Sequence, residues 1–415
     1  MAKIPTQDWI PNVAFFQLFL LAFDIVHDFQ RLCLPRSYLR RRARAKLEAL
    51  MPVPFNSSSP AVRLSSLILK KIWPHRTRRA LSPQFARLWN WKEIERVLMP
   101  DTLPVTKEIG CWLLRKLREI RQFEERIIPI YPTDVMVTPV HLHIGQEAVP
   151  VGVCAHLQPS DMLFFGHRTH GPALAKGLDM KKLMAELYGR TTGSARGYGG
   201  SMHLVDVANG MPGSSAIVGG SIALGVGSAL AAKLRKEDRI AVSHFGDGAT
   251  DSGVFWESIN FAALRQVPVL FVCEDNGLSN VMPKSAHMAV EVEKVVKEFM
   301  PVFCADGTDV LAVYGAGGEA IAYIRKEGKP AFLKCLTKRW MKHQGVEADD
   351  LSYNPVDRER DDPIKKLEAA MLEYKLITRD EIRQLAAEIE SQIDAAVKFA
   401  AASPFPDERD LAKEV

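Results

Sequence analysis

The residues with the clearest chemistry are an aspartate and an asparagine at the ends of two apolar runs. Asp247 lies in a Gly-Asp-Gly triplet after residues 240–245, and Asn276 follows residues 267–272. The segment 252–264 between them is predicted to be a helix, which makes the unit strand–turn–helix–strand. A right-handed crossover makes the two strands parallel, so their carboxyl ends share the edge where open α/β sheets bind ligands.

This pair of side chains favours a magnesium–diphosphate site. Carboxylate and amide oxygens suit Mg²⁺, which keeps phosphate oxygens among its other ligands. Gly248 and Ala249 follow Asp247 at a helix start, where backbone N–H groups and the helix dipole favour phosphate. A Gly-Asp-Gly triplet alone is typical of a surface turn, and the flanking strands with their spacing favour the metal site over that alternative.

The elements that must hold this unit predict an α/β fold, with a doubly wound, mostly parallel sheet flanked by helices. Thr106 is predicted to cap an amphipathic helix, and residues 221–234 form a helix of small side chains suited to a close subunit contact. Residues 189–200 are glycine-rich and are predicted to form a long loop. The chain is predicted to be helical again from residue 363 to residue 401.

Six further stretches resemble, in the same order, the α subunit of a 2-oxo-acid dehydrogenase E1 component of the heterotetrameric type. They are RQFEE from Arg121, HLHIGQE from His141, GHRTHG from Gly166, GGSMH from Gly199, IVG from Ile217 and SPFP from Ser403. The resemblance runs from about residue 106 to the C-terminus. It implies the thiamine-diphosphate-binding fold, with thiamine diphosphate and Mg²⁺ as cofactors.

The resemblance also implies roles for individual residues. The metal ligands would be Asp247, Asn276 and the backbone carbonyl of Leu278. The other cofactor contacts would come from His167, Arg168, Ala216, Val218, Gly248, Ala249 and His343. The catalytic histidines would be His141, His170 and His343.

Three departures from the family pattern stand out. His167 replaces a tyrosine, Asp275 replaces the first asparagine of a pair, and Gln344 replaces a serine that is phosphorylated in many relatives. Asp275 is predicted to point into a local hydrogen-bond network because Asn276 has the ligand position. Kinase control at Gln344 is not expected, and the surrounding residues are more similar to acetoin-dehydrogenase-like α subunits.

The implied function is decarboxylation of a 2-oxo acid, or cleavage of an acyloin such as acetoin, with transfer of the acyl group to a lipoyl E2. A β subunit is expected to complete an α2β2 heterotetramer, because the glutamate that activates the cofactor belongs to that subunit in this family. Two alternatives remain open. One is a thiamine-diphosphate-dependent carboligase or synthase without a lipoyl partner, and the other is a noncatalytic subunit that retains the fold.

Composition divides the chain into a basic extension, residues 1–98, and an acidic remainder. The extension has 17 Lys and Arg against 6 Asp and Glu, whereas the whole chain has a net charge of +5. The basic run 36–46 favours a solvated arm over contact with RNA, an acidic partner or anionic lipid. The extension has an uncertain fold, and a mis-assigned start upstream of Met99 is an alternative. A cofactor-binding domain is expected over 99–362, with a helical region packed on it over 363–415.

The remaining features predict a cytoplasmic protein. The six cysteines are scattered without metal spacing, which fits a reducing compartment. The apolar run 13–23 is too short to span a bilayer, which needs about 20 residues. We expect no transmembrane segment and no nucleic acid partner.

Overall fold

The computed structural model describes residues 103–136, 138–349, 355–407 and 409. These residues form one compact unit. The basic extension 1–98, and with it the expectations about its fold and contacts, lies outside the described residues.

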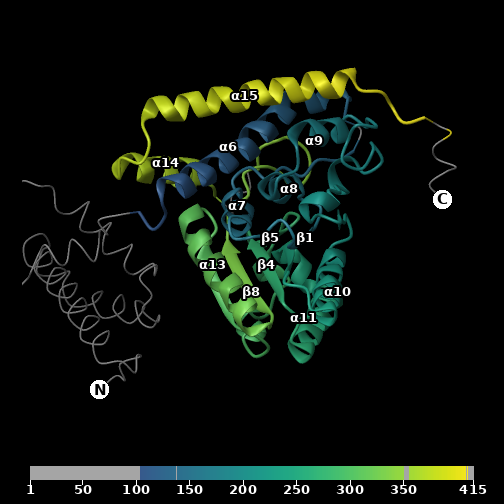
Figure 1. The fold of residues 1–415 in the computed structure, drawn as a ribbon, viewed down its shortest axis with the longest axis vertical. Helices are drawn as coiled ribbons and strands as arrows, with labels where there is room; N and C mark the ends of the chain where they lie inside the picture. Colours follow the sequence, from purple (N-terminus) through teal and green to yellow (C-terminus); the bar gives the residue numbers. More distant parts are fainter. Residues whose placement is uncertain (1–102, 137, 350–354, 408, 410–415) are drawn as a thin grey trace, which may run out of the picture. The chain divides into compact units, whose positions relative to one another are not determined.

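The centre of the fold is a sheet of six parallel strands in the order β2-β1-β3-β4-β8-β7 (Figure 1). Their bounds are β1 Met162–Phe165, β2 Gly213–Ser214, β3 Ala241–Gly246, β4 Val269–Asp275, β7 Val302–Asp306 and β8 Ala331–Leu336. A short antiparallel pair follows β4, made of β5 (Leu278–Ser279) and β6 (Met282–Pro283). The α/β class with a mostly parallel sheet, predicted from the sequence, is confirmed.

Helices cover both faces of this sheet (Figure 1). The face under β1, β3 and β4 carries α10 (Gly220–Arg235) and α11 (Gly253–Arg265), and α13 (Val310–Glu327) lies along β7 and β8. The other helices are α6 Lys107–Ile130, α7 Ala148–Cys154, α8 His170–Lys176, α9 Met180–Leu187, α12 Val292–Val296, α14 Pro363–Glu373 and α15 Arg379–Ala402.

The strands alternate their side chains between two apolar cores because successive residues of a strand point to opposite faces. Val242 and Val272 belong to the core that includes α6, α7 and α13. Phe245 and Phe271 belong to the core under α10 and α11. A parallel sheet buried on both faces needs such continuous apolar strands.

The predicted strand–turn–helix–strand unit matches the structure closely. The first strand and the helix lie within one residue of their predicted bounds, and a 3₁₀ turn, η5 (Asp247–Asp251), joins them. The second strand extends to Asp275, three residues beyond the predicted end. Gly246 of β3 pairs with Glu274 of β4, so Asp247 and Asn276 leave the sheet side by side.

The C-terminal region is helical as predicted, but it forms two helices and not one continuous run. The break lies between α14 and α15, where Lys375 has a left-handed φ of 56°. Thr378 starts the second helix with a capping box to Glu381, a local signal that the sequence contains. The long helix α15 packs across α6 and α9 (Figure 1).

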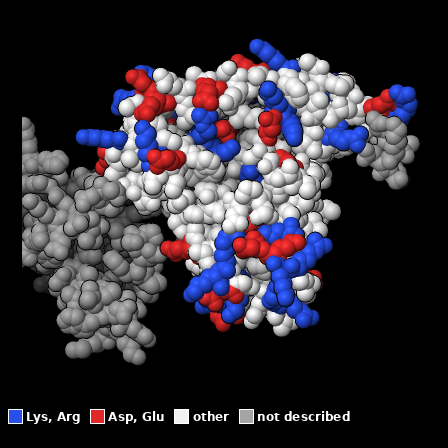
Figure 2. Space-filling view, viewed as in Figure 1, with Lys and Arg blue, Asp and Glu red and all other residues white. Residues whose placement is uncertain are grey.

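Charged side chains are unevenly distributed over the face drawn in Figure 2. Lys, Arg, Asp and Glu gather near the ends of α10, α11 and α13 and along α15, with a largely uncharged band between them. Among the described residues, no helix has both the length and the apolar character needed to cross a membrane.

Candidate active site

Asp247 lies at the carboxyl edge of the sheet, and its side chain is almost fully buried there. The residue is 4% exposed, and its Oδ2 has no hydrogen-bond partner among the described residues. Burial, reinforced by the charge of nearby Asp275, raises the pKa of Asp247 to about 7. An orphaned buried carboxylate is a costly arrangement that a bound cation would relieve. The geometry therefore fits a divalent metal ion.

Asn276 adds a second oxygen to this edge. Its Oδ1 accepts the backbone N–H of Leu278 at 3.0 Å, and its Nδ2 donates to Gln146 Oε1 at 2.9 Å. These contacts fix the amide, and a carbonyl oxygen has a second lone pair that can serve a metal. Thr337, just after β8, also donates to Gln146 Oε1 at 3.1 Å.

The loop after Asp247 passes very close to β5. A Cβ on Gly248 would lie 2.9 Å from Ser279 Oγ, so glycine is the residue that permits this approach. Ala249 follows and is buried in the same turn, η5. A close glycine-lined turn with backbone N–H groups is the kind of cradle that accepts a phosphate.

Asp275 lies in a network of lysines, which agrees with the predicted local hydrogen-bond network. Its Oδ2 lies 2.6 Å from Lys284 Nζ and 3.0 Å from Lys334 Nζ. Lys334 lies within β8, is 4% exposed, and also contacts Glu291 at 2.9 Å and Glu293 at 2.8 Å. Burial alone would lower the pKa of Lys334, but its carboxylate partners raise it overall. The two ammonium groups therefore offset the extra carboxylate.

Three histidines converge near this edge. The ring centroids of His141 and His167 are 4.6 Å apart, and each lies 5.1 Å from that of His343. Burial and the neighbouring imidazoles and arginines lower their pKa values to about 2, 3 and 4 respectively. All three rings are therefore neutral at physiological pH.

Arg168 stands beside this histidine cluster. Its Nη1 donates to the Leu142 carbonyl, and within the described part of the chain no carboxylate forms an ion pair with it. Burial, followed by the charge of Arg339, lowers the pKa of Arg168 to about 10, so the guanidinium stays charged at neutral pH. A half-buried guanidinium at this position is suited to forked contact with a phosphate.

His170 lies in a different environment from the other three histidines. It is fully buried, with Nδ1 3.1 Å from Glu124 Oε1 and Nε2 2.9 Å from Ser201 Oγ. Both ring nitrogens are thus occupied within the protein. The second oxygen of Glu124 accepts the backbone N–H of His143 at 2.6 Å, which ties His170 to the segment that carries His141.

Ala216 and Val218 lie between β2 and α10. Val218 is 51% exposed, and Ala216 is half-buried. Neither main chain forms a hydrogen bond with another described residue. These backbone groups are therefore available to a ligand.

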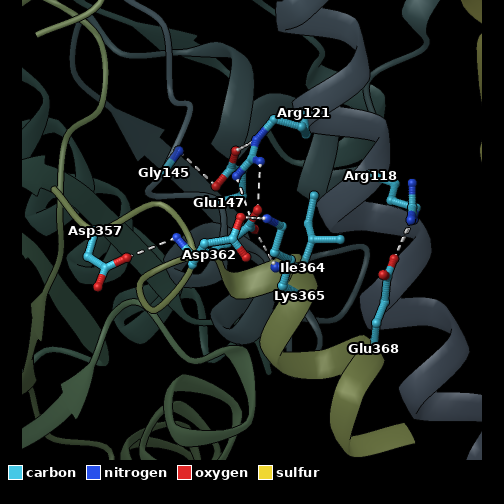
Figure 3. A network of polar contacts seen from close by, with 10 residues as sticks. Arg118, Arg121, Gly145, Glu147, Asp357, Asp362, Ile364, Lys365 and Glu368 are labelled. Carbon is cyan, nitrogen blue, oxygen red and sulfur yellow. Dashed lines mark hydrogen bonds and ion pairs between the residues drawn. The ribbon is translucent and has the colours of Figure 1, made fainter. Parts of the chain in front are cut away.

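A buried ionic network that the sequence reasoning missed holds the loops of the site. Arg121 of α6 binds Glu147 with Nε–Oε1 at 2.5 Å and contacts Asp362 at 3.4 Å (Figure 3). The Gly145 N–H donates to Glu147 at 3.0 Å, and the guanidinium lies 4.6 Å from the centroid of the Trp340 ring. This network joins the segment after His141 to the one before His343.

A second buried network, which was not predicted from the sequence, centres on Glu274. Glu274 Oε1 lies 2.8 Å from His143 Nε2 and 3.3 Å from His244 Nε2. Burial alone would raise the pKa of Glu274, but the two imidazoles lower it well below its usual range. The sequence did contain one signal for this network, because two adjacent carboxylates, Glu274 and Asp275, end an apolar strand and need polar partners when buried.

Similarity to known proteins identifies the family of this chain. The family described as "Dehydrogenase E1 component" matches residues 115–409. The α subunit of acetoin:2,6-dichlorophenolindophenol oxidoreductase from Bacillus subtilis is 37% identical over 327 residues, covering 77% of this chain and 97% of that subunit. Its counterpart from Cupriavidus necator is 37% identical over 75% of this chain and 96% of its own length. The pyruvate dehydrogenase E1 component subunit alpha from Rhizobium meliloti is 33% identical over 75% of this chain and 90% of its own length. The chain therefore belongs to the dehydrogenase E1 component family, as a member of the α-subunit type.

Proposed function

We propose that this α subunit binds magnesium and thiamine diphosphate and acts, with a β subunit, on a 2-oxo acid or an acyloin. The observation that carries the proposal is the buried Asp247 carboxylate, whose Oδ2 has no hydrogen-bond partner among the described residues. When bound, thiamine diphosphate supplies the carbon nucleophile and the electron sink for cleaving the bond next to the carbonyl.

The metal would be held by Asp247, Asn276 and the carbonyl of Leu278. The neighbouring N–H groups of Gly248 and Ala249 would bind the diphosphate, together with Arg168. His167 and His343 would donate to the same anion as neutral imidazoles. The main chain of Ala216 and Val218 would hold the aminopyrimidine.

His141 would act on the substrate as a neutral hydrogen-bond donor. Its lowered pKa keeps the ring uncharged at physiological pH, so it can orient a carboxylate or carbonyl and exchange a proton without becoming a resident cation. His170, with both nitrogens occupied by Glu124 and Ser201, would position the His141 segment and would not reach the reacting atoms.

A β subunit would complete the site in an α2β2 assembly. Six large apolar side chains around α10 and α11 are 38% to 74% exposed, and a free surface rarely carries so many. They are Ile217, Val218, Leu224, Leu234, Phe261 and Leu264. Ile217 and Val218 adjoin Ala216, so a partner covering them would lie against the cofactor. The proposed acceptor of the acyl group is a lipoyl-bearing E2. The proposed location of the enzyme is the cytoplasm.

An acyloin such as acetoin is the favoured substrate among those considered. Two relatives that match nearly over their whole length are named as acetoin oxidoreductase subunits. The residues around Gln344 are also more similar to those of acetoin-dehydrogenase-like α subunits. A 2-oxo acid stays the second candidate because the Rhizobium meliloti relative is named as a pyruvate dehydrogenase subunit.

The test is a substrate panel with the full chain co-expressed with its β subunit, in Mg²⁺ and thiamine diphosphate. We expect reduction of dichlorophenolindophenol with acetoin or one of several 2-oxo acids, and acyl transfer to a lipoyl domain. Dye reduction without transfer to the lipoyl domain would favour the carboligase or synthase alternative.

The variant Asp247→Ala tests whether this site carries the activity. It should abolish activity, whereas Asp179→Asn, which retains a helix-capping side chain at the exposed start of α9, should not. No turnover with any substrate, or activity unchanged by Asp247→Ala, would contradict the proposal.

A further inference from the structure

The three clustered histidines have the composition of a transition-metal site. One ring nitrogen from each of His141, His167 and His343 lies within 4.8 Å of one from each of the other two. The three residues come from separate segments, so the tertiary fold brings them together. His141 is 6% exposed, and its Nδ1 has no hydrogen-bond partner in the part of the chain that the structure describes.

We propose that His141, His167 and His343 bind a divalent transition-metal ion of the Zn²⁺ type, leaving a fourth position for an exchangeable ligand. Three imidazoles with one open position are an established zinc ligand set. A Zn–N distance of about 2.0–2.1 Å in tetrahedral geometry places the ligand nitrogens about 3.3 Å apart. The rings must therefore move together by roughly 1 Å to close on the ion.

The protonation state of the cluster supports metal binding. Imidazole binds metals in its neutral form, and a ring that is already neutral loses no proton on binding. Burial, together with the charge of Arg168, lowers the pKa of all three rings, which agrees with neutral imidazoles at the cluster.

The histidine cluster is chemically distinct from the oxygen site at Asp247 and Asn276. Mg²⁺ prefers oxygen ligands, whereas Zn²⁺ and Co²⁺ are well served by imidazole. A buffer with excess Mg²⁺ therefore separates the two sites. His167 completes the cluster, since the tyrosine that the family pattern has at that position would leave only two imidazoles.

The charge of Arg168 opposes a bare dication and favours an anion in the fourth position. Its guanidinium lowers the pKa of all three histidines, which places positive potential at the cluster. The same potential would stabilise a metal-bound hydroxide or phosphate oxygen. Inorganic phosphate should therefore strengthen metal binding.

Metal binding would also compete with the cofactor, and this consequence rests on the proposed function. There, His167 and His343 contact the diphosphate and His141 contacts the substrate. Rings that close on a metal ion cannot keep those positions, so a bound transition metal would inhibit the enzyme.

The experiment is a Co²⁺ titration of the full chain in excess Mg²⁺, followed by visible absorption. We expect one Co²⁺ per chain and the intense bands of tetrahedral cobalt, which added Zn²⁺ removes. The variant His167→Tyr should bind Co²⁺ at least about tenfold more weakly than the wild type. Replacing a residue that only hydrogen-bonds to a metal ligand already lowers metal affinity about 10–100-fold, and this variant removes a ligand itself. His203→Ala, which removes an exposed histidine outside the cluster, should bind Co²⁺ like the wild type.

A weak octahedral spectrum, or equal Co²⁺ affinity in His167→Tyr, would overturn the proposed site. Thermal unfolding checks that the variant is folded, and His343→Gln gives a second test of the same prediction. In the complex with the β subunit, Mg²⁺ and thiamine diphosphate should displace Co²⁺. If the Co²⁺ bands persist in that complex, the three histidines do not bind both the metal ion and the cofactor. That result would also count against the cofactor contacts proposed for His167 and His343.

Discussion

Replacing Arg121 by methionine should lower the free energy of unfolding by about 3 to 5 kcal/mol, because it leaves a buried carboxylate unpaired. Glu147 is fully buried and lies 2.5 Å from Arg121 Nε, and Asp362 lies 3.4 Å from the same guanidinium. The variant also loses the contact with Trp340, which is worth about 0.5 to 2 kcal/mol. Methionine retains the apolar volume, so the loss reports charge and not a cavity.

Arg118 provides the matched control, one turn earlier on the same helix. It also pairs with α14, through Glu368, but both side chains are 19% exposed (Figure 3). Arg118→Met should therefore cost about 1 kcal/mol or less. Equilibrium urea unfolding of the full chain measures both variants. Equal losses, or a loss below about 1 kcal/mol for Arg121→Met, would refute the view that the buried network holds these segments together.

Three further predictions concern the proposed metal site, the lysines that pair with Asp275, and the apolar surface proposed to bind the β subunit. The pKa of Asp247 is raised to about 7, mainly by burial, so the stability associated with its protonated form is full below about pH 4 and is lost as the pH rises through 7. Asp247→Asn should thus stabilise the metal-free chain by about 1 to 3 kcal/mol at pH 8 and not at pH 4, as urea unfolding would measure. The same variant should abolish Mg²⁺-dependent binding of thiamine diphosphate in a calorimetric titration. A variant that is less stable than the wild type at pH 8 would contradict the raised pKa of Asp247. Lys334→Met leaves Asp275 with one ammonium fewer and should weaken cofactor binding about tenfold. The double variant with Asp275→Asn should recover most of that loss in the same titration, and no recovery would show that the two residues act independently. Leu224→Glu, at a side chain 56% exposed on α10, should block assembly with the β subunit in size-exclusion chromatography without lowering the thermal midpoint, whereas Val207→Glu, at a side chain 65% exposed, should leave assembly intact.

The unit around Asp247 was predictable because its determinants lie close together in the chain. Apolar runs, a glycine turn and one intervening helix define two parallel strands, and the parallel geometry then brings Asn276 to the same edge. The helical character of residues 363–401 was predicted, but the break within it was not. The chain turns at Lys375, and the Thr378 capping box that starts a new helix was overlooked.

The networks around the site were not predictable in the same way, because they join residues far apart in the chain. Arg121 and Asp362 meet only because α14 packs against α6. Asp275 reaches Lys334 because β8 enters the sheet beside β4, an order that strand patterns alone do not specify. One signal was present: a lysine within the apolar strand AFLKCL requires a carboxylate partner, although the sequence does not name it.

The lysine pairing explains how a second carboxylate would be tolerated next to the proposed diphosphate site. Asp275 stands beside Asp247, and two unpaired carboxylates there would repel an anionic cofactor. Lys284 and Lys334 both contact Asp275 within 3.0 Å, while Glu291 contacts both lysines from the other side. The two lysines therefore neutralise the negative charge of Asp275 at close range. The Oδ2 atom of Asp247 has no hydrogen-bond donor among the described residues, so the Asp247 carboxylate stays available for a metal ion. A substitution that looks unfavourable in the motif is thus compensated by residues on β8 and in the loop after β6.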